Sequence, residues 1–356
     1  MNYITAYNSL IQSGEIVASR RVKQVYARLA AATADTSGQY IFDEARASRP
    51  IAFIERFCKH SKGEWAGQSI SLELFQKAYI QALYGFIDRD TGCRQYRESF
   101  FLVGRKNGKS TLLAGLALYM LTSDGEGGAE VYSTATKYAQ ARLLFDEAHN
   151  MIKQSPALAR HFRKRKSDLY YEPAMSKFQP LARNSDTLDG LNASFVIMDE
   201  LHGVKDRNLY EVMRQSQSAR RQPLMIMITT AGTVRECIFD DMYTYAANVA
   251  DGVIADLHFL PILYELDDRS EWTDPAAWIK ANPALGAIKK PDDLTAKVER
   301  AKQNRNELSG VLCKEFNVRE TVKTAWLSFD DINNEQTFDL EQFRGAYCIG
   351  GVDLSI

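Results

Sequence analysis

Apolar residues in the first part of the chain follow a helical spacing. In residues 22–34 and 49–60 they recur every three or four positions, and breaker-rich stretches at 36–40 and 47–50 separate these segments. Such a spacing gathers apolar side chains on one face of a helix. The pattern predicts an N-terminal helical region over residues 1–65.

From Phe100 onward the pattern changes to short apolar runs that alternate with helical segments, within a predicted core over residues 66–265. Continuous apolar runs are typical of strands buried on both faces, as in a parallel sheet covered by helices. Segments 110–121 and 138–153 have helical periodicity. We therefore predict an α/β core with a mostly parallel sheet flanked by helices. Its strands are expected at 99–104, 130–136, 177–182, 194–200, 223–232 and 256–265.

Beyond residue 265 the chain becomes acidic and proline-interrupted over 266–286, and a polar helical segment follows at 291–316. A shift of this kind marks a boundary between structural units. We predict a small C-terminal linker subdomain over residues 266–345. Residues 347–356 look like the opening strand of a further sheet.

Composition narrows the class of protein. Of the 356 residues, 45% are apolar and 25% charged, as in a globular protein, and no run approaches the roughly 18 apolar residues of a membrane helix. The N-terminus lacks a secretory pattern, so we expect a cytoplasmic protein with no membrane contact. The net charge of −1 excludes a globally basic nucleic-acid binder and leaves local basic runs for DNA. Five scattered cysteines and five histidines without ligand spacing predict neither disulfides nor a transition-metal site.

A glycine loop stands between a strand and a helix. The strand FFLV is followed by GRKNGKST and then by the apolar helix LLAGLALYML, the order that a phosphate cradle requires. Lys109 would pair with the outer phosphates of ATP, and Ser110 would bind Mg²⁺. In the usual spacing the first glycine stands at position 103, which is Val103 here. The alternative is a Gly-Lys turn before an ordinary helix. The expected nucleotide contacts are Gly104, Arg105, Lys106, Asn107, Gly108, Lys109, Ser110 and Thr111.

Two acids end the predicted strand SFVIMDE. Asp199 can hold the water shell of Mg²⁺, and Glu200 can polarise the water that attacks ATP. The acids could instead cap the next helix. A further strand, 130–136, precedes the acidic strand, and this order favours the glutamate-bearing (ASCE, RecA-like) class of P-loop NTPases. We therefore predict ATP and Mg²⁺ as cofactors.

Three more residues complete the expected site. Thr229 and Thr230 end the strand 223–232, where their hydroxyls can sense the γ-phosphate, although paired threonines are common at strand ends. Gln76 follows an aromatic residue before a helix, and its amide can both donate to and accept from adenine. A surface glutamine on an amphipathic helix is the alternative.

These motifs together resemble the large terminase subunit of tailed double-stranded DNA bacteriophages. LELFQ, GRKNGKS, FVIMDELHG and ITTAG occur in the order of the adenine, phosphate, acidic and coupling motifs. The loop also fits, because large terminases carry a small residue, Arg, two residues, and Gly-Lys-Ser/Thr. The resemblance extends over residues 14–356.

The resemblance implies an ATP-driven motor that moves double-stranded viral DNA into a procapsid. Its implied partners are the DNA, the capsid portal protein, the small terminase subunit and further copies of the chain in a ring, implied to be a pentamer. Its implied location is the host cytoplasm, at the portal. A helicase or another translocase of the same class, or an assembly module that does not hydrolyse ATP, remains as an alternative.

The resemblance also implies a nuclease of the ribonuclease H type. Residues 346–356 would be its first strand, with Asp353 as its first metal ligand, and the chain would be truncated within that domain. One carboxylate cannot hold two metals, so nuclease activity requires the rest of the domain. Asp353 could also be an incidental acid at a strand end.

Several arginines are candidates for work on phosphates. Arg214 and Arg183 are the candidates for the arginine that a neighbouring subunit contributes to catalysis, and Arg105 would act within its own chain. Either of the first two could be a surface arginine in an ion pair. The densest basic runs, suited to DNA phosphates or simply solvated, are Arg163, Lys164, Arg165 and Lys166, and Arg220 with Arg221.

Overall fold

The computed structural model describes residues 1–135, 137–182, 190–204, 207–233, 237–320, 339, 341, 344 and 345. The chain divides into two units, Met1–Thr321 and Val322–Ile356. In the second unit Arg344 Nε and Glu341 Oε2 form an ion pair at 2.9 Å. The candidates Arg183 and Asp353 lie outside the described residues.

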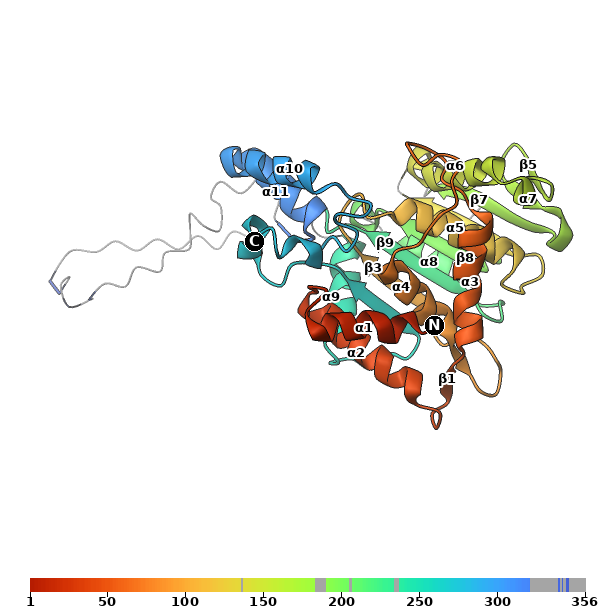
Figure 1. Ribbon diagram of the computed structural model, residues 1–356, viewed down its shortest axis with the longest axis horizontal. Coiled ribbons are helices and arrows are strands. Elements are labelled where there is room, and N and C mark those ends of the chain that lie inside the picture. The colour runs from red at the N-terminus through yellow and green to blue at the C-terminus, as the bar shows by residue number, and fades with distance from the viewer. Residues whose placement is uncertain are drawn as a thin grey trace. The chain divides into compact units, whose positions relative to one another are not determined.

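One eight-stranded sheet forms the centre of the first unit (Figure 1). Its first six strands are parallel, and β6 and β5 add an antiparallel edge. The predicted α/β class is thus confirmed, and every predicted strand of the core is found. In sheet order the strands are β10 (Phe259–Leu263), β3 (Glu98–Leu102), β9 (Leu224–Thr229), β8 (Phe195–Asp199), β4 (Glu130–Ala135), β7 (Ser176–Ala182), β6 (Leu169–Tyr171) and β5 (Phe162–Lys164).

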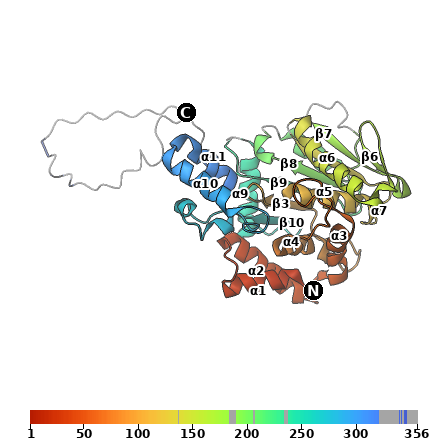
Figure 2. The same cartoon turned by 45° about the horizontal axis from the view of Figure 1, so that its top comes forward.

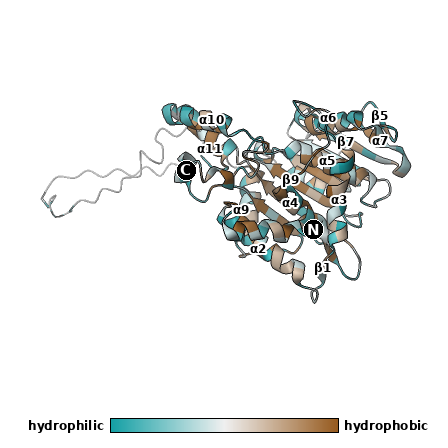
Figure 3. Ribbon diagram, viewed as in Figure 1, coloured by the Kyte–Doolittle hydropathy of each residue, from teal (hydrophilic) through white to brown (hydrophobic). Residues whose placement is uncertain are grey.

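Helices cover the sheet on both faces. The connections β3 to β4 and β9 to β10 run in opposite directions across the sheet, and right-handed crossovers then place their helices on opposite faces. Helix α5 (Lys109–Thr122) packs beside α6 (Tyr138–Gln154), whereas α9 (Ile238–Ala250) packs on β10 and β3 (Figure 2). Ten consecutive residues of α5 are buried, so this helix is apolar all round. Figure 3 shows apolar colours on the strands and polar ones on α10.

The predicted N-terminal helical region contains helices and one short strand. The expected break at 47–50 is wrong, because α3 runs through Pro50. This helix begins further upstream, where the Asp43 side chain accepts a hydrogen bond from Arg46 N at 2.9 Å, and the buried Pro50 ring packs inward. The elements of this region are α1 (Tyr3–Ser13), α2 (Arg20–Ala34), β1 (Tyr40–Phe42) and α3 (Glu44–Phe57). Helix α4 (Leu74–Gly85) and strand β2 (Phe86–Asp88) follow it, and β1 pairs with β2.

Residues 266–320 have a small hydrophobic cluster of their own, built around Trp278, Leu294 and Phe316. The helix expected over 291–316 is two helices, α10 (Pro291–Gln303) and α11 (Arg305–Glu315). They separate at Asn304, whose side chain accepts a hydrogen bond from Asn306 N at 3.1 Å and so caps α11.

The remaining elements are short or lie at the sheet edges. They are α7 (Pro156–Ala159), α8 (Asn208–Gln215) and the single-turn helices Glu172–Ala174, Leu201–Gly203, Arg269–Thr273 and Trp278–Lys280. Within the described part of the chain, every helix is too short or too polar to cross a membrane.

Candidate functional site

Three neighbouring strands end at one edge of the sheet and carry the predicted motifs. β9 lies between β3 and β8, with Leu102 opposite Thr229 and Asp199 opposite Ile228. Because parallel strands expose their carboxyl ends at the same edge, the phosphate loop, the coupling threonines and the acidic pair meet there. The order of strands brings together Lys109, Asp199 and Thr229, which stand 90 and 30 residues apart along the sequence.

The phosphate loop ends at Gly108, which caps α5. Gly108 has a left-handed backbone with φ of 79° and offers no capping side chain, so the N–H groups of the first turn of α5 are left for a ligand. A Cβ at this position would lie 2.9 Å from Gln76 Nε2 and 3.0 Å from Ile288 Cδ1. Gly108 is therefore needed for both its conformation and its close packing.

Lys109 is the first residue of α5, and its amine contacts no carboxylate among the described residues. Its Nζ lies 3.3 Å from the Val103 carbonyl oxygen, and it forms no ion pair with any described residue. Burial lowers the pKa of Lys109, while the nearby charges of Asp199 and Glu200 raise it. Ser110 and Thr111 follow in the first turn of the helix, and Ser110 is exposed.

The acidic pair lies at the end of β8. Asp199 Oδ1 accepts a hydrogen bond from Glu200 N at 2.9 Å. Burial raises the pKa of Asp199 to about 6, and Glu200 adds to this rise while Lys109 opposes it. Glu200 has φ of 56°, a left-handed conformation that is unfavourable for a residue with a side chain. This strain turns the chain sharply after the strand.

His202 links Glu200 to the coupling threonines. Its Nε2 lies 3.1 Å from Glu200 Oε2, and its Nδ1 lies 2.9 Å from Thr229 Oγ1. The same hydroxyl lies 2.8 Å from the Thr230 carbonyl oxygen. A Cβ at Gly232 would come within 2.4 Å of the His202 ring, so only glycine leaves room for this arrangement. Burial lowers the pKa of His202, against the opposing effect of Glu200.

Sequence reasoning missed His202, because isolated histidines are usually structural. The signal available was its place two residues after the glutamate of the acidic motif. Thr230 offers a further unused group. Its hydroxyl is buried and makes no hydrogen bond within the described part of the chain.

Gln76 lies beside the phosphate loop, inside the first turn of α4 rather than before it. It is buried, and its Oε1 accepts a hydrogen bond from Glu73 N at 3.0 Å. One acceptor position of the amide therefore caps the helix, and Nε2 faces Gly108. Contact with adenine stays a prediction.

A buried polar cluster joins the phosphate loop to the linker subdomain, and we call its residues Asn107, Asn282, Lys289 and Glu315 the linker network. Asn282 Oδ1 accepts hydrogen bonds from Asn107 Nδ2 at 3.1 Å and from Lys289 Nζ at 2.6 Å. Lys289 Nζ also lies 2.5 Å from Glu315 Oε2. The Asn107 side chain further accepts from Ala284 N at 3.0 Å. Sequence reasoning assigned Asn107 to the phosphates but missed the other three.

Residues 314–319 contact both the phosphate loop and the coupling motif. Arg105 N donates to the Lys314 carbonyl oxygen at 3.0 Å, and Gly104 has no room for a Cβ, which would lie 2.6 Å from the Glu315 carbonyl oxygen. Asn317 Oδ1 accepts from the N–H of residue 231, the alanine of the coupling motif, at 3.1 Å. Segment 314–319 therefore touches two of the three motifs.

The arginine candidates take different positions. Arg105 and Lys106 are exposed on the loop. Arg214 Nε pairs with Glu98 Oε1 at 3.0 Å, at the start of β3 and so at the opposite edge of the sheet. It does not join the site of its own chain, and its role at a neighbouring site stays a prediction.

The two basic runs also differ. Residues 163–166 lie on the β5–β6 hairpin and its turn, where Arg163 pairs with Glu172 at 2.9 Å and the Arg165 guanidinium lies 3.5 Å from the centre of the Tyr170 ring. Arg220 donates to the carbonyl oxygens of residues 128 and 192, each at 2.8 Å, and its side chain is 9% exposed. Arg220 is therefore structural and not a DNA contact.

Comparisons with known proteins match two family models to the chain. The model of the terminase large subunit ATPase domain matches residues 74–248, and that of the terminase large subunit endonuclease domain matches residues 253–356. The endonuclease match starts well before residue 346, where the sequence analysis expects the first nuclease strand.

Individual relatives lead to the same family. The terminase large subunit of Enterobacteria phage HK97 is 29% identical over 263 residues, which are 72% of this chain and 50% of that protein. The terminase large subunit of Lactococcus phage p2 is 24% identical over 327 residues, 89% of this chain and 59% of that protein. The crystal structure of the HK97 bacteriophage large terminase aligns with a TM-score of 0.68 and 26% identity over 77% of this chain and 55% of that one.

The chain spans about half the length of these relatives. The two family models nevertheless cover most of it, and the sheet, loop and acidic pair described above occupy the ATPase match. The chain belongs to the family of large terminase subunits.

Proposed function

We propose that this chain hydrolyses ATP and uses the free energy to move double-stranded viral DNA into a procapsid. The observation that carries the proposal is the meeting of Lys109, the Asp199-Glu200 pair and the coupling threonines at one edge of three adjacent strands. A partly buried cation, two acids and an open helix N-terminus are groups that suit nucleotide hydrolysis.

The residues present fit Mg²⁺ with ATP. The N–H groups after Gly108 have no capping side chain, Lys109 lacks a carboxylate contact, and the buried Thr230 hydroxyl lacks any partner among the described residues. Each is a donor that a phosphate oxygen can satisfy. Ser110 and Asp199 would hold the metal. Bound Mg·ATP supplies a γ-phosphoryl group whose charge the metal partly neutralises.

Each side chain of the site has its own task. Glu200 accepts a proton from the attacking water, and Lys109 stabilises the negative charge that grows on the phosphate oxygens. Arg105, exposed on the loop, acts on the phosphates of the ATP that is bound to its own chain. Arg214 and Arg183 remain candidates for the arginine that a neighbouring subunit contributes.

His202 contacts Glu200 through Nε2, and the Thr229 hydroxyl on the other side of the ring sets which nitrogen carries the ring hydrogen. That hydroxyl has one hydrogen and two acceptors in reach, His202 Nδ1 at 2.9 Å and the Thr230 carbonyl oxygen at 2.8 Å. When Nδ1 accepts it, the neutral ring carries its own hydrogen on Nε2 and donates it to Glu200. When the hydrogen goes to Thr230, Nδ1 carries the ring hydrogen and Nε2 turns a lone pair toward the carboxylate. A small movement of the coupling strand end therefore changes how Glu200 is held.

The linker subdomain would receive the motion. Segment 314–319 contacts the phosphate loop through Arg105 N and the coupling motif through Asn317. Loss of the γ-phosphate would shift both contact points together. The linker subdomain would then move against the ATPase core, and the DNA would move with it.

We further propose the partners and location that the family implies. The chain would form a ring on the capsid portal protein in the host cytoplasm, with the small terminase subunit delivering the DNA. The β5–β6 hairpin, which carries Arg163, Lys164, Arg165 and Lys166, supplies the sequence-independent grip on DNA phosphates. DNA cutting would belong to the nuclease domain of the complete protein.

Steady-state ATPase assays test this proposal. We expect Mg²⁺-dependent phosphate release that duplex DNA stimulates, and its loss in Lys109→Ala and Glu200→Ala. Strand separation of a duplex would favour a helicase instead. Wild-type turnover in Glu200→Ala would refute the catalytic assignment.

A further inference from the structure

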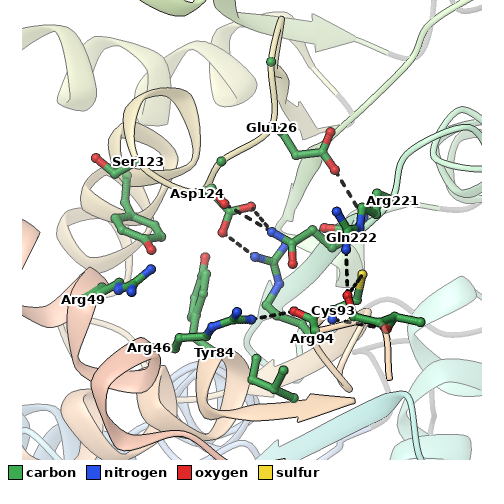
Figure 4. A pocket seen from close by; sticks show the side chains of 16 residues that line it. Arg46, Arg49, Tyr84, Cys93, Arg94, Ser123, Asp124, Glu126, Arg221 and Gln222 are labelled. Carbon is green, nitrogen blue, oxygen red and sulfur yellow. Dashed lines mark hydrogen bonds and ion pairs between the residues drawn. The ribbon is translucent and has the colours of Figure 1, made fainter. Parts of the chain in front are cut away.

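A second polar cavity lies at the edge of the sheet opposite the phosphate loop. Its volume is about 340 Å³, within the range of small-molecule sites. It is enclosed by α3, the ends of α4 and α5, the turn before β3 and the residues before β9 (Figure 4). Helix α5 carries Lys109 at one end and reaches this cavity at the other, about 20 Å away at 1.5 Å per residue.

The charges that line the cavity do not balance. Four arginines and two carboxylates face it, which leaves an excess of two positive charges. Both carboxylates are already engaged. Asp124 pairs with Arg94 and accepts from Gln222 Nε2 at 3.2 Å, and Glu126 pairs with the structural Arg220 at 3.5 Å.

The other three lining arginines have little opposing charge. Arg49 makes no hydrogen bond or ion pair within the described ranges and is exposed. Arg221 donates to the carbonyl oxygen of Thr91 at 2.6 Å, and Arg46 lies 3.5 Å from Asp43 outside the cavity. Guanidinium groups gathered without matching acids favour an anion.

The floor of the cavity holds buried donors without partners. Tyr84 is 3% exposed and Arg94 5% exposed, and neither the Tyr84 hydroxyl nor Arg94 Nε makes a hydrogen bond in the described part of the chain. Figure 4 shows the Tyr84 hydroxyl pointing into the space between Arg49 and Asp124. Leaving a buried polar group unpaired is costly, so each such group calls for a partner.

We propose that this cavity binds a dianionic phosphate group, either inorganic phosphate or a terminal phosphate monoester. Such a group carries nearly two negative charges and three acceptor oxygens, and so matches the charge excess and the unpaired donors. A carboxylate or an internal phosphodiester carries one negative charge and leaves the second unmatched. The site is independent of the proposed ATPase, because it shares no residue with the phosphate loop.

The phosphate can come from a free ion or from the end of a nucleic-acid strand. Calorimetry with inorganic phosphate at fixed ionic strength tests the first source. Fluorescence anisotropy with a single-stranded octanucleotide, bearing either a 5′-phosphate or a 5′-hydroxyl, tests the second. The variants are Arg49→Met, Tyr84→Phe and Lys109→Met, and Arg160→Met is the control because that arginine is exposed and unpaired within the described residues.

We expect phosphate affinity to fall about tenfold in Arg49→Met and to fall also in Tyr84→Phe, while Arg160→Met stays unchanged. Binding at the cavity persists in Lys109→Met, which removes only the phosphate-loop site. A preference for the 5′-phosphorylated strand that Arg49→Met abolishes assigns the site to DNA ends, and its absence assigns the site to free phosphate. Phosphate binding that only Lys109→Met reduces, or that Arg49→Met and Arg160→Met reduce equally, overturns the proposal.

Discussion

Two lysines in this molecule, the buried Lys289 and the partly buried Lys109, have opposite surroundings. Lys289, in the linker network, contacts Glu315 Oε2 at 2.5 Å and Asn282 Oδ1 at 2.6 Å. Among the described residues, the amine of Lys109, in the candidate nucleotide site, has one hydrogen-bond partner, the carbonyl oxygen of Val103 at 3.3 Å. Burial lowers the pKa of both amines.

The difference separates a structural charge from a charge held ready for a ligand. A buried ion pair with completed hydrogen bonds holds two segments together, and removing one partner leaves the other charge buried and unpaired. A partly buried ammonium without a carboxylate contact does not stabilise the fold, and its field is free to act on a phosphate. The comparison predicts that replacing Lys289 lowers stability, whereas replacing Lys109 lowers activity.

The largest effect is expected at the linker network. In Lys289→Met the Glu315 carboxylate stays buried with only Lys297 near it, at 3.2 Å. We expect the free energy of unfolding to fall by about 3–5 kcal/mol, measured by urea denaturation. The exposed pair of Lys302 and Glu299 supplies the control, since Lys302→Met should change stability by less than about 0.5 kcal/mol. If Lys289→Met and Lys302→Met lowered the free energy of unfolding equally, Lys289 would have no special structural role.

Lys109→Met should leave folding almost intact and destroy activity. We expect ATP turnover to fall about 10²- to 10³-fold, because the variant removes the charge that stabilises the transition state. The free energy of unfolding should stay within about 1 kcal/mol of the wild type. Lys153→Met, an exposed change on α6, controls for the loss of a lysine. A large loss of stability in Lys109→Met would make this lysine structural after all.

The unpaired charge of the nucleotide site should also appear as a pH dependence. Burial raises the pKa of Asp199 from 3.8 to about 6, so the folded protein holds this proton more tightly than the unfolded chain does. Stability from this group is therefore lost as the pH rises from about 4 to about 6. Asp199→Asn should stabilise the ligand-free protein at pH 7.5 by up to about 3 kcal/mol, and the gain should vanish near pH 4. If Asp199→Asn and the wild type had the same urea midpoint at pH 7.5 as well as near pH 4, the raised pKa of Asp199 would be contradicted.

The smallest effect is expected at His202. Replacing it with alanine removes the support of Glu200, and we expect kcat to fall about 10- to 100-fold with little change in KM. His202→Gln should recover part of the rate, because its amide can donate to Glu200. His258→Gln is the control, since His258 lies at the start of β10. An unchanged kcat in His202→Ala would show that Glu200 needs no such support.

The sheet and the phosphate loop could be predicted because their signals are local. Buried strands are continuous apolar runs, and a strand, a glycine loop and a helix follow one another in the chain. The linker network could not be predicted, because Asn107 and Asn282 are separated by 175 residues and meet only in the folded chain. Nothing in the local sequence distinguishes Lys289 from an exposed lysine.

Three expectations failed or changed for physical reasons. Pro50 does not break α3: the helix begins at Glu44, behind the Asp43 cap, and continues through the buried proline. The helix over 291–316 divides because Asn304 caps a second helix. Arg220 is not free for DNA, because backbone carbonyl oxygens already accept from its guanidinium.

Phosphate release from Mg·ATP by the wild type and Glu200→Gln, with ATP binding followed in parallel, tests the central claim most directly. The glutamine keeps the shape of Glu200 but cannot accept a proton from water. We predict unchanged ATP affinity and turnover at least about 100-fold slower in Glu200→Gln. Wild-type turnover in that variant would contradict the account.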